Sequence, residues 1–184
     1  SFNLLDGKAG VDTLIGGSGE DAYIVDLKIT GTGAAAIASL EDIVLELGTD
    51  TVFAVGDSLS LRGTAILSKA STITLSNGIE LLDAADTGNT LLNFTGNTLN
   101  NTITGNTANN QLDGSTGNDT MTGGTGNDTY IVDSTSDSVV ETSTLATEID
   151  SVQTSATYTL SSNLENLLLT GTSGCGPLLR EEQR

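Results

Sequence analysis

Aspartate and glycine recur at a fixed spacing in two stretches of this 184-residue chain. Residues 114–122 read GSTGNDTMT and residues 123–131 read GGTGNDTYI, with glycine at positions one and four and aspartate at position six. Residues 7–15 (GKAGVDTLI) and 16–24 (GGSGEDAYI) repeat this pattern near the start. Glycine permits sharp turns, and the carbonyl oxygens that such turns expose join carboxylates as the ligands that hard divalent cations prefer. The spacing therefore indicates metal binding by turns.

Apolar residues follow the same nine-residue period. One inward side chain in each nonapeptide suits a very short strand, and two nonapeptides then make one coil of turn, strand, turn and strand. Strands of successive coils pair in parallel, so that their inward side chains stack. We therefore predict an all-β fold of parallel β-roll (β-solenoid) segments joined by β-rich connectors. The eighth positions from residue 87 to residue 140 are Phe94, Ile103, Leu112, Met121, Tyr130 and Val139.

The pattern divides the chain into two copies of one larger unit, because residues 3–26 align with residues 110–133 and residues 74–82 resemble residues 159–167. Alternation predicts short strands at 150–154 and 156–160, whereas residues 37–47 fit either a helical turn or strands. The predicted parts are a short roll array truncated at its start (1–33), a β-rich connector (34–86), a second array (87–140), a second connector (141–172) and a tail (173–184).

Composition excludes several classes of function. The chain has 24 acidic and 6 basic residues, a net charge of −18, which argues against nucleic acid and anionic membrane surfaces as partners. No apolar run is long enough to predict membrane insertion. Histidine is absent, which removes catalysis by Ser-His-Asp or Cys-His groups and histidine metal sites. A single cysteine permits no intrachain disulfide. We therefore expect no enzymatic activity in this chain.

Calcium is the predicted cation, because Ca²⁺ accepts about six or more oxygen ligands, whereas Mg²⁺ needs a tighter octahedron. Turns of nonapeptides i and i+2 lie one coil apart on the same edge, so Asp119 should face Asp137, Asp128 should face Asn110, Asp21 should face Asn3 and Asp12 should face Thr30. The candidate carboxylate ligands are Asp12, Asp21, Asp119, Asp128 and Asp137. The candidate carbonyl suppliers are Gly7, Gly10, Gly16, Gly17 and Gly19 in the first array and Gly114, Gly117, Gly123, Gly124 and Gly126 in the second.

Residues 16–24 and 123–131 fit the pattern G-G-x-G-x-D-x-U-x, with U apolar, and resemble the RTX or haemolysin-type calcium-binding repeat family. The resemblance implies parallel β-rolls, calcium-dependent folding, and export of the parent protein by a type I secretion system. Some turns depart from the pattern, with Lys8 at position two and Leu92 at position six. Asn101 and Asn110 also replace the aspartate, and we predict that they hydrogen-bond along the stack rather than hold a cation.

The expected function is structural. The chain should be a calcium-binding module of a larger secreted or cell-surface protein, which folds and stiffens on Ca²⁺ binding outside the cell. Two alternatives stay open. One is an adhesin or surface-layer module that uses the roll or connector face to bind a surface, a glycan or another copy of itself. The other is an accessory module of a secreted enzyme whose catalytic domain lies elsewhere.

Overall fold

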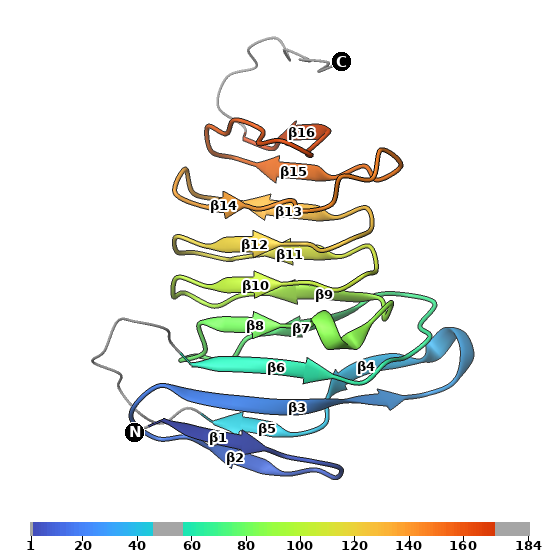
Figure 1. Ribbon diagram of the computed structural model, residues 1–184, viewed down its shortest axis with the longest axis vertical. Coiled ribbons are helices and arrows are strands. Elements are labelled where there is room, and N and C mark those ends of the chain that lie inside the picture. The colour runs from blue at the N-terminus through green and yellow to red at the C-terminus, as the bar shows by residue number, and fades with distance from the viewer. Residues whose placement is uncertain (1, 46–56, 172–184) are drawn as a thin grey trace.

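The chain winds into a stack of coils in the computed structural model, which describes residues 2–45 and 57–171 (Figure 1). Strands of successive coils lie above one another and pair in parallel. The fold is a parallel β-solenoid of about seven turns with only 4% helix, so the predicted fold class is confirmed. Among the described residues, no helix is long and apolar enough to span a membrane.

Two parallel sheets run along the stack. The first has the strand order β1-β3-β6-β8-β10-β12-β14, and β4 joins it by antiparallel pairing with β3. The second has the order β16-β15-β13-β11-β9-β7, and β2 pairs separately with β5. The first sheet contains β1 (Asn3–Asp6), β3 (Asp21–Thr30), β4 (Ile37–Leu40), β6 (Ser58–Arg62), β8 (Leu81–Asp83), β10 (Thr102–Thr104), β12 (Thr120–Thr122) and β14 (Ser138–Val139). The others are β2 (Thr13–Ile15), β5 (Ile43–Leu45), β7 (Ser71–Thr74), β9 (Leu92–Thr95), β11 (Gln111–Asp113), β13 (Thr129–Val132), β15 (Ser151–Thr154) and β16 (Asn166–Leu169).

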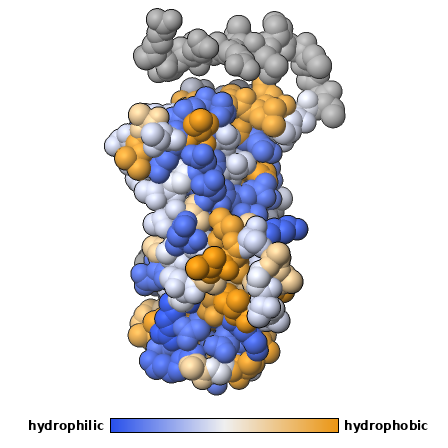
Figure 2. Space-filling model, turned by 90° about the vertical axis from the view of Figure 1, so that its right-hand side faces the viewer, coloured by the Kyte–Doolittle hydropathy of each residue, from blue (hydrophilic) through white to orange (hydrophobic). Residues whose placement is uncertain are grey.

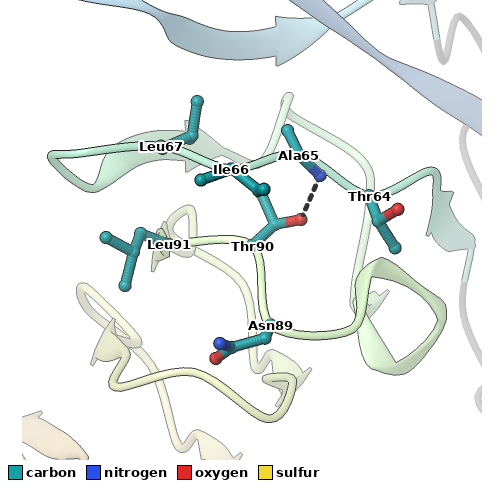
Figure 3. A pocket seen from close by; sticks show the side chains of 7 residues that line it. All are labelled: Thr64, Ala65, Ile66, Leu67, Asn89, Thr90 and Leu91. Atoms are coloured by element: carbon teal, nitrogen blue, oxygen red, sulfur yellow. Dashed lines mark hydrogen bonds between the residues drawn. The ribbon is translucent and has the colours of Figure 1, made fainter. Parts of the chain in front are cut away.

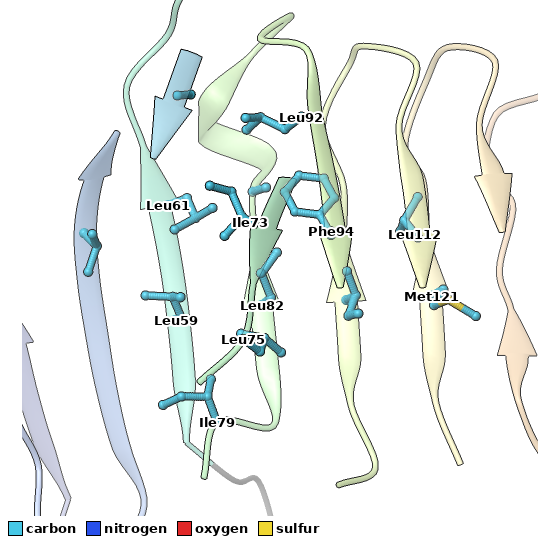
Figure 4. Close-up of a cluster of buried hydrophobic side chains, with 14 of the residues drawn as sticks. Leu59, Leu61, Ile73, Leu75, Ile79, Leu82, Leu92, Phe94, Leu112 and Met121 are labelled. Carbon is cyan, nitrogen blue, oxygen red and sulfur yellow. The ribbon is translucent and has the colours of Figure 1, made fainter. Parts of the chain in front are cut away.

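The core is a ladder of single apolar side chains from facing strands (Figure 4). In β10 and β12 the central Ile103 and Met121 are register partners, and in β11 and β13 Leu112 partners Tyr130. All four side chains have 0% exposure. The two threonines of β10 or β12 flank the inward residue, since successive strand residues point to opposite faces. The six eighth-position residues are all buried, which confirms the predicted ladder.

The segments that follow the arrays continue the same stack. Strand β6 lies between β3 and β8, and β15 lies between β13 and β16. The ambiguous segment forms strands rather than a helical turn, with β4 and β5 inside residues 37–45. The division into arrays and connectors stays a prediction, and the predicted tail lies outside the described residues.

The strand predicted at 150–154 is confirmed as β15, but the strand predicted at 156–160 is wrong. Tyr158 and Leu160 pack against the core without joining a sheet. The nearest strand of the first sheet, β14, contains only two residues, so it offers little backbone for a further strand to pair with. Two 3₁₀ turns, η1 (Gly33–Ala35) and η2 (Ala85–Thr87), complete the described elements.

Candidate metal-binding edges

Acidic and amide side chains form columns along the edges of the stack, directly before the strands. In the first column Asp119 accepts a hydrogen bond at Oδ1 from the Asn101 amide, at 2.7 Å. The Asp119 amide in turn donates to Asp137 Oδ1, at 3.1 Å. Asp119 therefore faces Asp137, as the pairing of nonapeptides i and i+2 predicts. Each carboxylate links its own coil to a backbone amide one coil below.

A second column precedes the strands of the other sheet. Asp128 Oδ1 accepts from the Asn110 amide at 2.7 Å, which is the predicted pair. On its other side the Asp128 amide donates to Asp150 Oδ1, also at 2.7 Å. The Asp150 amide donates to Glu165 Oε2 at 2.7 Å, so the column continues beyond the repeats.

The first array extends the first column, because Asp21 begins β3 in the same sheet as β12, and it adds a third column before β2 and β5. Asp21 Oδ1 accepts from the Asn3 amide at 2.6 Å, as predicted, and the Asp21 amide donates to Asp57 Oδ1. The prediction for Asp12 is wrong, because its amide donates to Asp42 Oδ1 at 2.9 Å rather than facing Thr30. The reason is that residues 21–30 run on as the ten-residue strand β3, where Thr30 pairs with Ile37, instead of turning after nine residues.

The second carboxylate oxygen of several column residues is buried without a hydrogen-bond partner. These atoms are Oδ2 of Asp21, Asp42, Asp119 and Asp128. The residues themselves are between 1% and 4% exposed. Buried polar atoms in folded proteins almost always have a partner, and an uncompensated buried charge is costly. The columns therefore contain acceptor oxygens that require a cation or a proton.

Glycine at the first repeat position makes room for these oxygens. A Cβ on Gly114 would lie 2.3 Å from Asp119 Oδ2, and a Cβ on Gly123 would lie 2.1 Å from Asp128 Oδ2. On Gly7 it would lie 2.0 Å from Asp42 Oδ2. Any larger residue at these positions would displace the carboxylate. Glycine is therefore required at position one of the repeat because of the small space beside the unpartnered carboxylate oxygen, and not because of its backbone conformation.

The other predicted glycines shape the turns. A Cβ on Gly124 would lie 2.2 Å from the Asn106 carbonyl oxygen, and the φ of Gly124 is +108°, so no other residue fits there without strain. The Gly16 carbonyl oxygen accepts a hydrogen bond from Asn3 Nδ2 at 3.2 Å. The remaining predicted glycines with positive φ are Gly10, Gly17, Gly19, Gly117 and Gly126.

Burial raises the pKa of three carboxyl groups in the columns, those of Asp119, Asp128 and Asp150. It is the largest cause of the rise in the pKa of Asp119 to about 6, with further contributions from Asp137, Asp133 and Asp113. Burial likewise raises the pKa of Asp128 to about 7, helped by Asp150, Glu141 and Glu148. Hydrogen bonds from the backbone amides oppose both shifts. Among the described residues, no ion pair involves Asp119 or Asp128, so their charges lack a cationic side chain.

A family model for the RTX calcium-binding nonapeptide repeat matches residues 2–26 and 95–130, in four copies. The chain carries RTX calcium-binding repeats. The matched segments include the sixth-position residues Asp12, Asp21, Asp119 and Asp128, whereas Asp137 and the residues after it lie outside them. Comparison with the curated proteins and with the solved structures finds no match to this chain.

Asparagines replace aspartate in the RTX turns between residues 96 and 113, and they hydrogen-bond to the coil below. Asn110 Nδ2 donates to the Leu92 carbonyl oxygen at 2.8 Å, and Asn101 Nδ2 donates to that of Ile79 at 3.2 Å. The prediction that these amides hydrogen-bond along the stack is confirmed. The side-chain amide of each asparagine therefore donates a hydrogen bond within the stack, which the carboxylate of an aspartate cannot do.

Several column residues outside the RTX repeats were not predicted from the sequence. Asp42, Asp57, Asp150, Glu80 and Glu165 take the place that the sixth-position aspartate has in a repeat. They share a local signal, since each precedes a strand and the second residue after it is apolar, as in Asp42-Ile43-Val44 and Asp150-Ser151-Val152. This signal does not depend on the nine-residue spacing.

A pocket on the side of the stack lacks comparable chemistry (Figure 3). There the Ala65 amide donates to Thr90 Oγ1 at 2.8 Å. Figure 2 shows an apolar patch around and below the middle of one side of the stack, with hydrophilic residues above and below it. The pocket is lined by Thr64, Ala65, Ile66, Leu67, Asn89, Thr90 and Leu91, none of which is titratable. The acidic edges therefore remain the candidate site.

Proposed function

We propose that this chain is a calcium-responsive structural module, in which Ca²⁺ lies between stacked turns and stabilises the roll. The observation that carries the proposal is the set of buried carboxylate oxygens without hydrogen-bond partners, at positions where the repeats place aspartate. A cation that accepts several oxygens would satisfy these atoms and offset their charge. The family to which the repeats belong is calcium-binding, which supports the choice of ion.

The residues fit such an ion. Asp119 and Asp137 would supply carboxylates in one column, Asp128 in the second, and Asp21 and Asp12 in the first array. Asp42 joins this set because its Oδ2 is buried beside Gly7. Carbonyl oxygens of the glycine turns would complete the coordination, since the Gly114 and Gly123 carbonyls point along the stack toward Gly96 and Gly105. The ion would supply positive charge and rigid links between coils.

Calcium concentration would then decide whether the roll forms. In a cytosol poor in calcium, repulsion within a chain of net charge −18 favours the open form, which suits export through a secretion system. Outside the cell, abundant calcium binds only the folded state and stabilises it by mass action. The molecule would thus leave the cell unfolded and stiffen outside. The adhesin and enzyme-accessory alternatives stay predictions.

Calorimetric titration of the chelator-treated chain tests this proposal. We expect calcium to bind, and magnesium at the same concentration to bind far more weakly. Asp119→Asn removes a proposed ligand and should weaken the site between Asp119 and Asp137 by at least about 10-fold, because loss of even an outer partner of a metal ligand typically costs about 10–100-fold in affinity. Asp86→Asn makes the same charge change at an exposed residue of η2 and should leave the titration unaltered. Equal titrations for the two variants, or no heat from calcium at all, would overturn the proposal.

A further inference from the structure

Three carboxylates converge at the end of the second array, where the repeats give way to the following segment. Asp128 belongs to the last matched repeat, whereas Glu141 and Asp150 lie after it. One carboxylate oxygen from each of the three lies within 4.8 Å of the others. Two oxygens bound to one Ca²⁺ at about 2.3–2.6 Å are at most about 5 Å apart, so one ion can reach all three.

The cluster is buried, and one of its oxygens has no partner. Asp128 and Asp150 are 1% and 2% exposed, and Glu141 is 9% exposed. Asp128 Oδ1 is occupied by the Asn110 amide, which leaves Oδ2 as the buried oxygen without a hydrogen bond. That atom and the Tyr130 hydroxyl oxygen would both crowd a Cβ on Gly123, at 2.1 and 2.5 Å. Asp128 Oδ2 therefore faces the side on which Tyr130 meets Glu141.

Hydrogen bonds hold the other two carboxylates in place. The Tyr130 hydroxyl donates to Glu141 Oε2 at 2.9 Å and accepts from the Gly123 amide at 2.9 Å. Glu141 Oε1 accepts from the Ser143 amide at 2.6 Å, which closes the turn after the side chain. Asp150 is fixed by its bond from the Asp128 amide. Backbone amides and the Tyr130 hydroxyl therefore hold these carboxylates in position.

Glu148 adds a fourth acid from the same loop. Its Oε1 accepts from the Gly126 amide at 2.9 Å, so the loop folds back onto the turn of the last repeat. Its Oε2 is buried without a hydrogen-bond partner. Two orphaned oxygens, one from the repeat and one from the loop, therefore occur at this seam. Among the described residues, the carboxylates of Asp128, Glu141 and Asp150 form the one group of three whose oxygens lie within 4.8 Å of one another.

We propose that Asp128, Glu141 and Asp150 form a terminal calcium site that joins the last RTX repeat to residues 141–150. The site deepens the proposed function and rests on it, but it uses ligands that the nonapeptide does not contain. With three carboxylates it carries more negative charge than a site built from two aspartates and carbonyls. It binds Ca²⁺ or a trivalent lanthanide more tightly, since ligand charge sets affinity in oxygen sites. The bound ion fixes the loop to the end of the array.

Terbium luminescence tests the terminal site in the full chain. Tb³⁺ takes oxygen ligands as Ca²⁺ does, and a nearby tyrosine sensitises its emission, so Tyr130 reports an ion bound to Glu141. We expect Glu141→Gln and Asp150→Asn to raise the dissociation constant for sensitised emission at least about 10-fold. Asp86→Asn, the same loss of charge at an exposed residue of η2, should leave it unaltered. Tyr130→Phe should remove the part of the emission that Glu141→Gln also removes, while calcium still binds by calorimetry, and Tyr23→Phe should leave that part unchanged.

The outcomes separate the two proposals. If calcium and terbium bind nowhere, the proposed function fails together with the terminal site. If calcium binds but Glu141→Gln and Asp150→Asn give emission like the native chain, the terminal site alone is overturned. Circular dichroism with calcium, and calorimetry of the Asp119 site, establish that a variant is folded. Anomalous scattering from terbium in crystals of the native chain needs no substitution, and an ion beyond coordination distance of Glu141 and Asp150 would equally overturn the site.

Discussion

Removing calcium with a chelator is expected to lower the midpoint of thermal unfolding of this chain by about 15 °C or more near neutral pH. The buried column carboxylates then have no cation to offset their charge, and the Oδ2 atoms of Asp21, Asp42, Asp119 and Asp128 keep no partner. At a calcium concentration 100 times the dissociation constant, one site adds about 2.7 kcal/mol to the free energy of unfolding. Three filled sites add about 8 kcal/mol, and a chain of this size shifts by about 2–4 °C per kcal/mol.

Circular dichroism melts in calcium, in chelator, and in chelator with calcium restored measure this effect. Magnesium at the calcium concentration is the matched control, because it adds the same charge but needs an octahedral site. The midpoint should return to its original value when calcium is restored, and it should not do so with magnesium. A midpoint that is the same in calcium and in chelator would contradict the account.

The calcium-free chain is expected to lose stability as the pH rises from about 5 to about 8, whereas the calcium-bound chain gains it. In the folded state the pKa values of Asp128 and Asp119 are about 7 and 6, and the pKa of Asp150 is about 6. An unfolded aspartate has a pKa of about 3.9. The folded state therefore binds these protons more tightly, and the stability that they contribute is lost as the pH rises through 6 to 7.

Neighbouring groups strengthen this dependence. Asp128 is faced by Asp150, Glu141 and Glu148, which are all acidic, so deprotonation adds mutual repulsion. Asp6 behaves oppositely, because Arg62 and Lys8 hold its pKa well below the usual range. The stabilising contribution of Asp6 is lost only as the pH falls below the pKa of an ordinary aspartate, and this lies below the range from pH 5 to pH 8.

Calcium reverses the sign because its ligands must be deprotonated, so its contribution grows over the same pH range. Urea unfolding at a series of pH values, with calcium and with chelator, gives the two free-energy profiles. We expect profiles of opposite slope between pH 5 and 8. A chelated chain whose stability is flat or rises across that range would refute the assignment of the buried carboxylates.

The nine-residue period predicts the coils whose lengths are regular. Asp119 and Asp137 are 18 residues apart, two nonapeptides, and they meet as the spacing requires. Glycine and aspartate at fixed positions leave the chain little choice, since the turn needs positive φ and the inward residue must be apolar. The ladder from Phe94 to Val139 follows directly.

The rest of the stack escaped prediction because its coils differ in length. Asp12 and Asp42 are 30 residues apart, and Asp128 and Asp150 are 22 apart, yet both pairs occupy neighbouring coils. Insertions of this kind loop out between strands without disturbing the strands themselves, so a rule based on spacing misses the partner. These coils can be recognised at any spacing by an acidic residue two positions before a buried apolar residue. The acidic side chain accepts the hydrogen bond from the neighbouring coil and the apolar side chain points into the core, so both features lie in the same short segment.

Anomalous diffraction from crystals grown in calcium tests the central claim most directly, that an ion between stacked turns satisfies the buried carboxylate oxygens. We expect an anomalous peak within about 2.3–2.6 Å of Asp119 Oδ2, beside Gly114 and facing the turn that carries Asp137. The same map should place an ion beside Asp128 Oδ2. A roll folded as described here, with no ion at either oxygen at saturating calcium and with each oxygen bonded to a protein donor or water instead, would contradict the account.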